Sequence, residues 1–160
     1  MPPRELAGLV IAFDGSDASR AALEQAVELF PGRAAVIATV WEPGLALQIP
    51  AYESLGSVTP PADLDTINEI DRAQRDHATQ VARAGAELAT SLGLAAQPRP
   101  VEDEVDVADT LVDLAHTTGA AAIVIGSRGL TGLRSRIMGS VARKLLSHSR
   151  CPVVVVRHRD

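Results

Sequence analysis

The segment "AAAIVIGSRGLTGLRSRIMGSVARKLLSHSRCPVVVVR", residues 120–157, contains the pattern that decides the fold. It opens with an apolar run at 120–126, passes through a glycine-containing stretch and an amphipathic stretch at 140–149, and ends in a second apolar run at 152–157. Short apolar runs of this kind are typical of strands buried on both faces, and the stretch between them has helical spacing. The order strand, helix, strand predicts a right-handed crossover between parallel strands.

Strand and helix patterns also alternate through the rest of the chain. Further strands are expected at Leu6–Phe13, Ala34–Trp41 and 94–102. Further helices are expected at 18–30, 65–90 and 105–119. Because Pro98 and Pro100 cannot donate to a ladder, the strand that contains them is expected at a sheet edge.

Four strand–helix units closed by a fifth strand predict an α/β fold. The expected architecture is a doubly wound, Rossmann-like sheet of five parallel strands, order 3-2-1-4-5, with four helices on its two faces. With 160 residues, 46% of them apolar, the whole chain 1–160 is expected to form a single domain. The proline- and glycine-containing stretch 42–64 is expected to be a long irregular loop.

Two details of packing can also be predicted. The helix over 65–90 is expected to bury a stripe at spacings of three and four, made of Ile67, Ile70, Gln74, His77, Val81, Ala84 and Leu88. Trp41, at the end of a strand, either stacks on a bound ring or is a partly buried core residue.

Composition and charge exclude several classes of function. A formal net charge of −5 argues against a general nucleic-acid binder. The single cysteine, Cys151, excludes an internal disulfide, and His116, His148 and His158 show no metal-ligand spacing. No run approaches membrane-spanning length and the first residues lack a long apolar core, so a cytoplasmic location is expected.

Basic residues nevertheless gather in and after the glycine-containing stretch. They are Arg128, Arg134, Arg136, Arg143, Lys144 and Arg150. A basic cluster on an acidic chain favours a small anionic ligand over a long polyanion. The arginines after Gly132 are compatible either with phosphate contact or with an ordinary helix surface.

The glycines follow the spacing Gly126-x2-Gly129-x9-Gly139-Ser140. In doubly wound sheets, ligands bind beyond the carboxyl ends of the strands where the strand order reverses, and Gly126 and Asp14 leave strands four and one there. Glycines let backbone N–H groups approach a phosphate, and Gly139 opens a helix whose N-terminus attracts anions. The spacing alone is equally compatible with simple turns, and it lacks the Gly-Lys-Ser/Thr of a P-loop.

This spacing resembles the nucleotide-binding motif of the universal stress protein family. The stretch "VIAFDGSDASRAALEQAVEL", residues 10–29, resembles the opening of that family, and residues 126–157 resemble its closing segment nearly throughout. The resemblance covers essentially the whole chain, although residues 42–104 match only in layout. Because every element of the glycine motif is present, the resemblance implies the ATP-binding subgroup.

The resemblance implies ATP with Mg²⁺ as the ligand, and it assigns roles to individual residues. The ribose and phosphates would be held by Gly126, Gly129, Gly139, Ser140 and the amide of Val141. Ser127 and Arg128 of the same loop are further candidates for nucleotide contact, and Arg128 or Arg136 could screen the terminal phosphate charge. Asp14 would meet the ribose or Mg²⁺, and the backbone at Val40 would read the adenine edge. The stretch "VEDEVDV", residues 101–107, departs from the family, which often has a glycine there. Its acids either crowd an anionic ligand or face solvent.

The resulting expectation is an ATP-binding universal stress protein that acts in stress response through its nucleotide state and dimerisation. The family commonly dimerises through its last strand, here Pro152–Arg157; the alternative is an edge protected by the charged tail "RHRD". At most slow ATP hydrolysis is expected, because no general base is evident beside a nucleophile. Three alternatives stay open: a cyclic AMP sensor, a nucleotide-independent interaction module, and an adenylylating enzyme of the ATP pyrophosphatase type. Neither a membrane nor a nucleic acid is expected as a partner.

Overall fold

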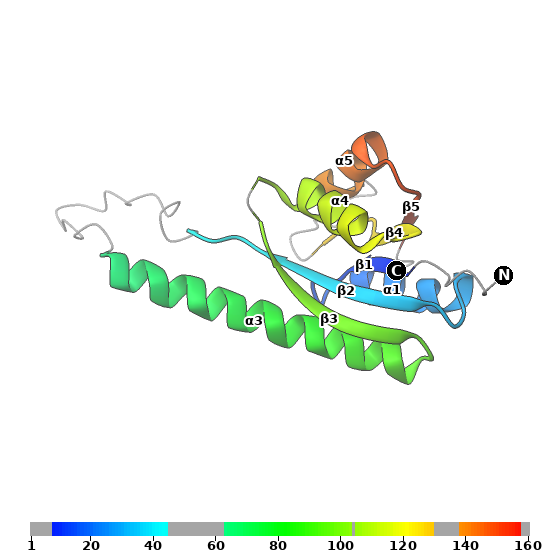
Figure 1. Ribbon diagram of the computed structural model, residues 1–160, viewed down its shortest axis with the longest axis horizontal. Coiled ribbons are helices and arrows are strands. Elements are labelled where there is room, and N and C mark those ends of the chain that lie inside the picture. The colour runs from blue at the N-terminus through cyan, green and yellow to red at the C-terminus, as the bar shows by residue number, and fades with distance from the viewer. Residues whose placement is uncertain (1–7, 45–62, 104, 130–137, 158–160) are drawn as a thin grey trace.

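The computed structural model describes residues 8–44, 63–103, 105–129 and 138–157 (Figure 1). The strands are β1 (Leu9–Ala12), β2 (Ala34–Trp41), β3 (Ala95–Glu102), β4 (Ala122–Gly126) and β5 (Val153–Val156). The helices among the described residues are α1 (Asp17–Leu29), α3 (Leu64–Ser91), α4 (Val107–Thr118) and α5 (Ser140–His148). Strands and helices therefore alternate as the sequence predicts. Of the predicted loop 42–64, residues 45–62 lie outside the described residues.

The five strands form one parallel sheet in the order β3-β2-β1-β4-β5, which confirms the predicted order. β3 lies at the edge and pairs with β2 from Ala34↔Ala95 to Trp41↔Glu102. The N–H of Asp103 donates to the carbonyl of Trp41 at 2.8 Å, so the odd-numbered residues of this segment direct their backbone groups toward β2. Pro98 and Pro100 consequently face outward, where a missing N–H costs no ladder bond and discourages pairing with another chain.

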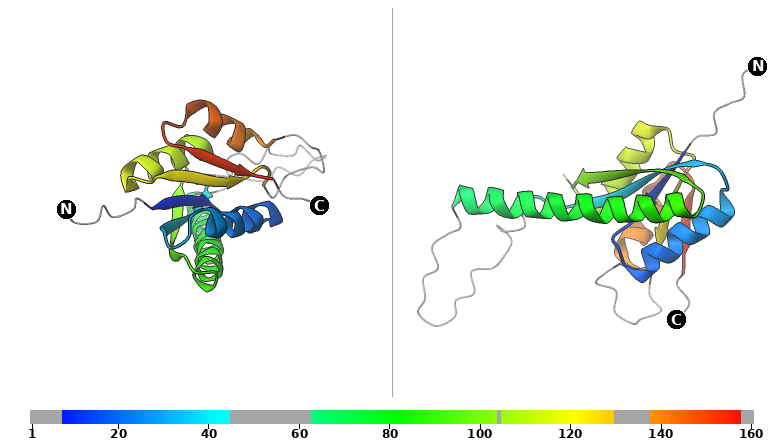
Figure 2. Two further views of the ribbon diagram at one scale, coloured as in Figure 1. Left: turned by 90° about the vertical axis from the view of Figure 1, so that its right-hand side faces the viewer. Right: turned by 90° about the horizontal axis from the view of Figure 1, so that it is seen from below.

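Helices cover both faces of the sheet, α1 and α3 on one side and α4 and α5 on the other (Figure 1, Figure 2). Alternate residues of β1 supply the two halves of the core. Leu9 and Ile11 pack with Leu23 of α1, whereas Val10 packs with Leu111 of α4. The carboxyl ends of the strands therefore share one edge, and the strand order reverses between β1 and β4.

Helix α3 extends well beyond the sheet, and its buried face differs from the predicted stripe (Figure 2). The buried residues are Ala78, Ala82, Gly85, Ala86 and Ala89. Of the predicted stripe, Val81 and Leu88 are partly buried against the core, whereas His77 and Ala84 are exposed. The cause is close packing: a Cβ on Gly85 would lie 2.7 Å from Cδ1 of Phe13 and 2.8 Å from Cγ2 of Ile37. The small-residue face therefore contacts the sheet.

Helix ends are fixed by local hydrogen bonds. The hydroxyl of Ser16 accepts from the N–H of Ser19 at 3.2 Å and caps α1. Gly119, with φ of 63°, ends α4 in the left-handed conformation that favours glycine. Among the helices that the structure describes, none combines the length and apolar character needed to span a membrane.

Candidate functional site

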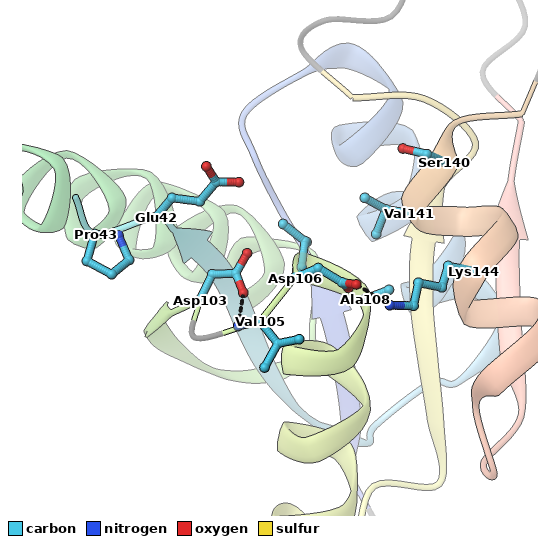
Figure 3. Close-up of a pocket in the computed structure, with 10 residues that line it drawn as sticks. Glu42, Pro43, Asp103, Val105, Asp106, Ala108, Ser140, Val141 and Lys144 are labelled. Carbon is cyan, nitrogen blue, oxygen red and sulfur yellow. Dashed lines mark hydrogen bonds and ion pairs between the residues drawn. The ribbon is translucent and has the colours of Figure 1, made fainter. Parts of the chain in front are cut away.

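A cavity of about 760 Å³ lies at the carboxyl edge of the sheet (Figure 3). The ends of β2 and β3 form one wall through Glu42, Pro43 and Asp103, and the first turns of α4 and α5 form the other. From α5 the lining residues are Ser140, Val141 and Lys144. Clefts of this volume are typical of small-molecule sites.

Asp14 and the glycine loop lie together at the switch point. Oδ1 of Asp14 accepts from the N–H of Ser16 at 2.9 Å, which holds the carboxylate in the turn before α1. A Cβ built on Gly129 would lie 2.9 Å from the other oxygen, Oδ2. Strand order thus places these two predicted site residues side by side, although they are far apart in the sequence.

Ser127 and Gly139, on either side of the undescribed segment 130–137, contact each other at the start of α5. The N–H of Gly139 donates to the carbonyl of Ser127 at 2.7 Å, while the N–H of buried Ser127 donates to the carbonyl of Val156 at 2.8 Å. Gly139 is the N-cap residue of α5 and supplies no side-chain cap. The N–H groups in the first turn of α5 belong to residues that line the cavity. Because no cap side chain covers these groups, they favour an anion.

The glycines of the motif do not all serve the same purpose. A Cβ on Gly126 would lie 2.7 Å from the carbonyl oxygen of Ala18 and 2.8 Å from its carbonyl carbon. A Cβ on Gly139 would meet no atom closer than 3.3 Å, the carbonyl oxygen of Ser127. Gly126 is therefore required for packing the first turn of α1 against β4, a role that the motif alone did not reveal.

Val40 directs its backbone toward the switch point. The carbonyl of Ala38 accepts from the N–H of Phe13 at 2.8 Å, and alternate residues of a strand face the same side, so Val40 also faces the β1 side. The last register pair with β1 is Ala12↔Ala38, and β2 continues past it to Trp41. The Val40 carbonyl consequently lies beyond the end of β1.

Of the predicted nucleotide contacts, two line the 760 Å³ cavity formed by described residues, Ser140 and Val141. The others are placed along the adjoining edge of the sheet: Asp14, Val40, Gly126, Ser127, Arg128, Gly129 and Gly139. Arg128 is half-buried after β4. The predicted basic residues Arg134 and Arg136 lie outside the described residues, and Arg143 donates from Nη2 to the carbonyl of Met138 at 3.1 Å.

The three acids at the end of β3 and directly after it lie in different surroundings. Glu102 is exposed, Asp103 lines the cavity, and Glu104 lies outside the described residues. Oδ1 of Asp103 accepts from the N–H of Val105 at 3.0 Å and from Oγ1 of Thr110 at 3.2 Å. Asp103 thus closes the turn into α4 and also adds negative charge to the cavity wall.

An ion-pair network between α4 and α5 was missed by the sequence reasoning. The ammonium of Lys144 donates to the carboxylate of Asp106 (Figure 3). It also donates to Oδ2 of Asp109 at 2.8 Å. Asp106 is also the N-cap of α4 and accepts from the N–H of Asp109 at 3.0 Å. One signal was available: the pattern Asp106-x-x-Asp109 is typical of a helix N-cap and places both carboxylates at the start of α4.

The contact between Lys144 and Asp106 shifts the pKa values of these two groups in opposite directions. The hydrogen bond from Lys144 is the main reason that the pKa of Asp106 lies below its usual 3.8, and the N–H of Asp109 adds to this effect. Hydrogen bonds to Asp106 and then Asp109 raise the pKa of Lys144 above 10.5. Asp106 and Lys144 are therefore both charged at neutral pH.

Fold and cleft together define an α/β domain with an anion-attracting helix end at the switch point of its sheet. Residues 8–157 match the universal stress protein family, and the chain belongs to that family. Universal stress protein YxiE of Bacillus subtilis is 30% identical over 149 residues, which span 93% of this chain and 97% of YxiE.

Two solved structures of the same fold contain adenine nucleotides. A universal stress protein in complex with cAMP has a TM-score of 0.62 and 23% identity, covering 98% of this chain and 100% of that one. The universal stress protein from Archaeoglobus fulgidus in complex with dAMP has a TM-score of 0.59 and 21% identity, covering 95% and 98%. At these identities the similarity shows the shared fold, and the nucleotides are ligands of those two proteins.

Proposed function

We propose that this protein binds an adenine nucleotide, ATP with Mg²⁺, at the carboxyl edge of its sheet and acts in stress response through its nucleotide state. The observation that carries the proposal is the N-terminus of α5, which Gly139 opens without a side-chain cap and which faces the cavity through Ser140 and Val141. Such a helix end attracts phosphate. Membership of the universal stress protein family and the cAMP and dAMP complexes of two structural neighbours support an adenine nucleotide as the ligand class.

The proposed contacts follow the edge of the sheet. Phosphates and ribose are held by Gly126, Gly129, Gly139, Ser140 and the amide of Val141, with Ser127 and Arg128 in the same loop. The backbone of Val40, which lies past the end of β1, accepts the adenine edge. Asp14, packed against Gly129, meets the ribose or the metal.

The described residues fit a metal ion that arrives with the nucleotide. Among them, no group of three or more His, Cys, Asp or Glu side chains is placed to hold an ion. Mg²⁺ does not need such a group, because it keeps several waters and is otherwise bound by substrate phosphates and one or two carboxylates. Asp14 supplies that carboxylate, and the bound ion would neutralise phosphate charge.

ATP turnover is expected to be slow at most. Two of the carboxylates in the described lining are already hydrogen-bonded, Asp103 to Val105 and Asp106 to Lys144 and Asp109. A general base must reach the proton of an attacking water, and these contacts hold both groups in structural roles. Phosphate release from ATP checks this directly: multiple turnovers per second would refute it.

Dimerisation is proposed through the last strand, Pro152–Arg157. The carbonyls of Pro152 and Val156 accept hydrogen bonds from the β4 segment, so Val153 and Val155 direct their backbone groups outward. An exposed strand edge of this kind pairs with another chain. We expect Val155→Pro to be monomeric in sedimentation equilibrium, whereas Val155→Thr, which keeps the N–H, stays dimeric; a dimeric proline variant would overturn this interface.

The proposal includes a cytoplasmic location, which fractionation of cells checks. A second candidate ligand is cyclic AMP, favoured by the cAMP complex of a structural neighbour. Calorimetric titration with ATP, ADP, AMP and cyclic AMP, with and without Mg²⁺, separates the candidates. We expect ATP with Mg²⁺ to bind in the micromolar range, about −8 kcal/mol. Tighter binding of cyclic AMP would select the second candidate, and well-folded protein that binds none of them would refute nucleotide binding.

A further inference from the structure

Two helix N-termini face the same cavity, but only one of them is capped by a side chain. The N-terminus of α5 has no side-chain cap, whereas that of α4 is covered by the carboxylate of Asp106, which accepts from the N–H of Asp109 at 3.0 Å. Both helix ends attract negative charge. At α4 this attraction is already satisfied by the protein, so an anionic ligand group is directed to α5.

Lys144 connects these two helix ends. It lies one turn after Ser140 on the same face of α5, and both residues line the cavity (Figure 3). Its ammonium reaches across to Asp106 and Asp109 on α4. The side chains are 34% exposed for Lys144 and 40% for Asp106, so their charges act on whatever occupies the cavity.

Lys144 is also the counter-charge of an otherwise acidic cavity. Among the described lining residues, the carboxylates are Glu42, Asp103 and Asp106, and Lys144 supplies the positive charge. In Figure 3, Glu42 and Asp103 lie on the wall opposite Ser140, whereas Asp106 lies beside Lys144. Without Lys144, the side of the cavity next to α5 would become acidic as well.

We propose that Lys144 is a positioning residue that sets the charge selectivity of the cleft. By neutralising Asp106 and Asp109 it keeps two carboxylates from repelling an anionic group at the N-terminus of α5, without touching that group itself. The proposal rests on the proposed function, because it takes the ligand to be an adenine nucleotide with its phosphate at α5. The raised pKa of Lys144 keeps the ammonium charged throughout the neutral range.

Calorimetric titration of ligands that differ in charge tests this role. Adenosine, cyclic AMP and AMP are titrated without Mg²⁺ into the wild-type protein and Lys144→Gln. Removing the positive charge of Lys144 leaves one more uncompensated negative charge near the ligand phosphate. At an effective dielectric constant between those of protein and water, this weakens the affinity by about threefold for each negative charge on the ligand. We therefore expect Lys144→Gln to leave adenosine affinity within about twofold, and to weaken cyclic AMP about threefold and AMP about tenfold.

Two further variants separate charge from packing. Lys144→Arg keeps the positive charge and is expected to bind all three ligands as the wild type does. The triple variant Asp106→Asn/Asp109→Asn/Lys144→Gln removes the carboxylates as well, and asparagine still caps α4, so it is expected to regain AMP affinity. Thermal unfolding of each variant confirms that the protein is folded.

The outcomes distinguish this proposal from the proposed function. If Lys144→Gln weakens the affinity for adenosine and for AMP equally, or weakens neither, the proposed charge role of Lys144 is overturned. Binding by the wild type would in that case still support the nucleotide site. Failure of the triple variant to regain AMP affinity would also overturn it. A folded wild type that binds none of the three ligands, and no ATP, would overturn the proposed function and this proposal with it.

Discussion

Replacing Gly126 with alanine adds one methyl group between β4 and the first turn of α1. The new Cβ would lie 2.7 Å from the carbonyl oxygen of Ala18, 2.8 Å from its carbonyl carbon and 3.0 Å from its Cβ. The first two atoms belong to the backbone of a helix, so no side-chain rotation relieves the contact. Strand and helix must separate, and this contact destabilises the folded state.

The magnitude follows from two opposing contributions. Overpacking of a buried contact costs about 1–3 kcal/mol. Gly126 lies in a strand and not at positive φ, so alanine fits the backbone and recovers about 0.4–1 kcal/mol by restricting the unfolded chain. We expect a net loss of about 1–2 kcal/mol of unfolding free energy, or a fall of about 2–8 °C in Tm for a chain of this length.

Urea unfolding of the ligand-free protein measures this loss. Gly139→Ala, from the same motif, is the control, because its nearest new contact is 3.3 Å and its φ of −60° suits alanine. We expect this variant to lose less than about 1 kcal/mol, mainly from a weaker N-cap. The reasoning is refuted if Gly126→Ala is as stable as the wild type, or if Gly139→Ala is the less stable variant.

Three further predictions concern the scaffold. Leu111 is a core residue of α4 and is 1% exposed. In urea unfolding, Leu111→Ala should lower the free energy of unfolding by about 2–5 kcal/mol and Leu111→Met by less than about 1.5 kcal/mol. A loss under about 1 kcal/mol for the alanine variant would contradict the core assignment. Ser16→Ala removes the cap of α1 and should lose about 1 kcal/mol, and Ser16→Asn should restore it; equal stabilities would show that the cap is unimportant. Because the pKa of Asp106 is lowered on folding, this group stabilises the protein above pH 3.8, and the stabilisation is lost as the pH falls through the pKa of Asp106 in the folded protein. Because the pKa of Lys144 is raised on folding, this group stabilises the protein below pH 10.5, and the stabilisation is lost as the pH rises through the pKa of Lys144 in the folded protein. Lys144→Gln should therefore lower Tm at pH 7 and flatten both limbs of the Tm–pH curve, and an unchanged curve would contradict the ion pair.

The fold was predictable because local patterns restricted the topology. Alternating apolar runs and helical stretches allow few arrangements once crossovers must be right-handed. Pro98 and Pro100 then identified the edge strand, since a central strand needs N–H groups on both sides. The register adds that both prolines face outward, which no one-dimensional pattern shows.

The errors arose where three-dimensional contacts determine the outcome. The predicted stripe of α3 followed hydrophobicity, and Val81 and Leu88 do pack against the core. The sheet approaches so closely at Gly85, however, that the alanine face is the most buried and His77 is exposed. The motif predicted that Gly139 opens a helix, but it did not reveal that Gly126 packs against the first turn of α1. The partners of Lys144 lie on a different helix, so spacing within α5 did not reveal them.

The central claim is that a nucleotide phosphate binds at the N-terminus of α5. Amide ¹⁵N–¹H NMR of the protein during titration with ATP and Mg²⁺ tests it most directly, with adenosine as the matched ligand that lacks phosphate. We expect the backbone amides of Ser140 and Val141 to shift strongly downfield with ATP and far less with adenosine, while those of the α4 first turn change little. ATP binding that leaves both α5 amides unmoved would contradict the account.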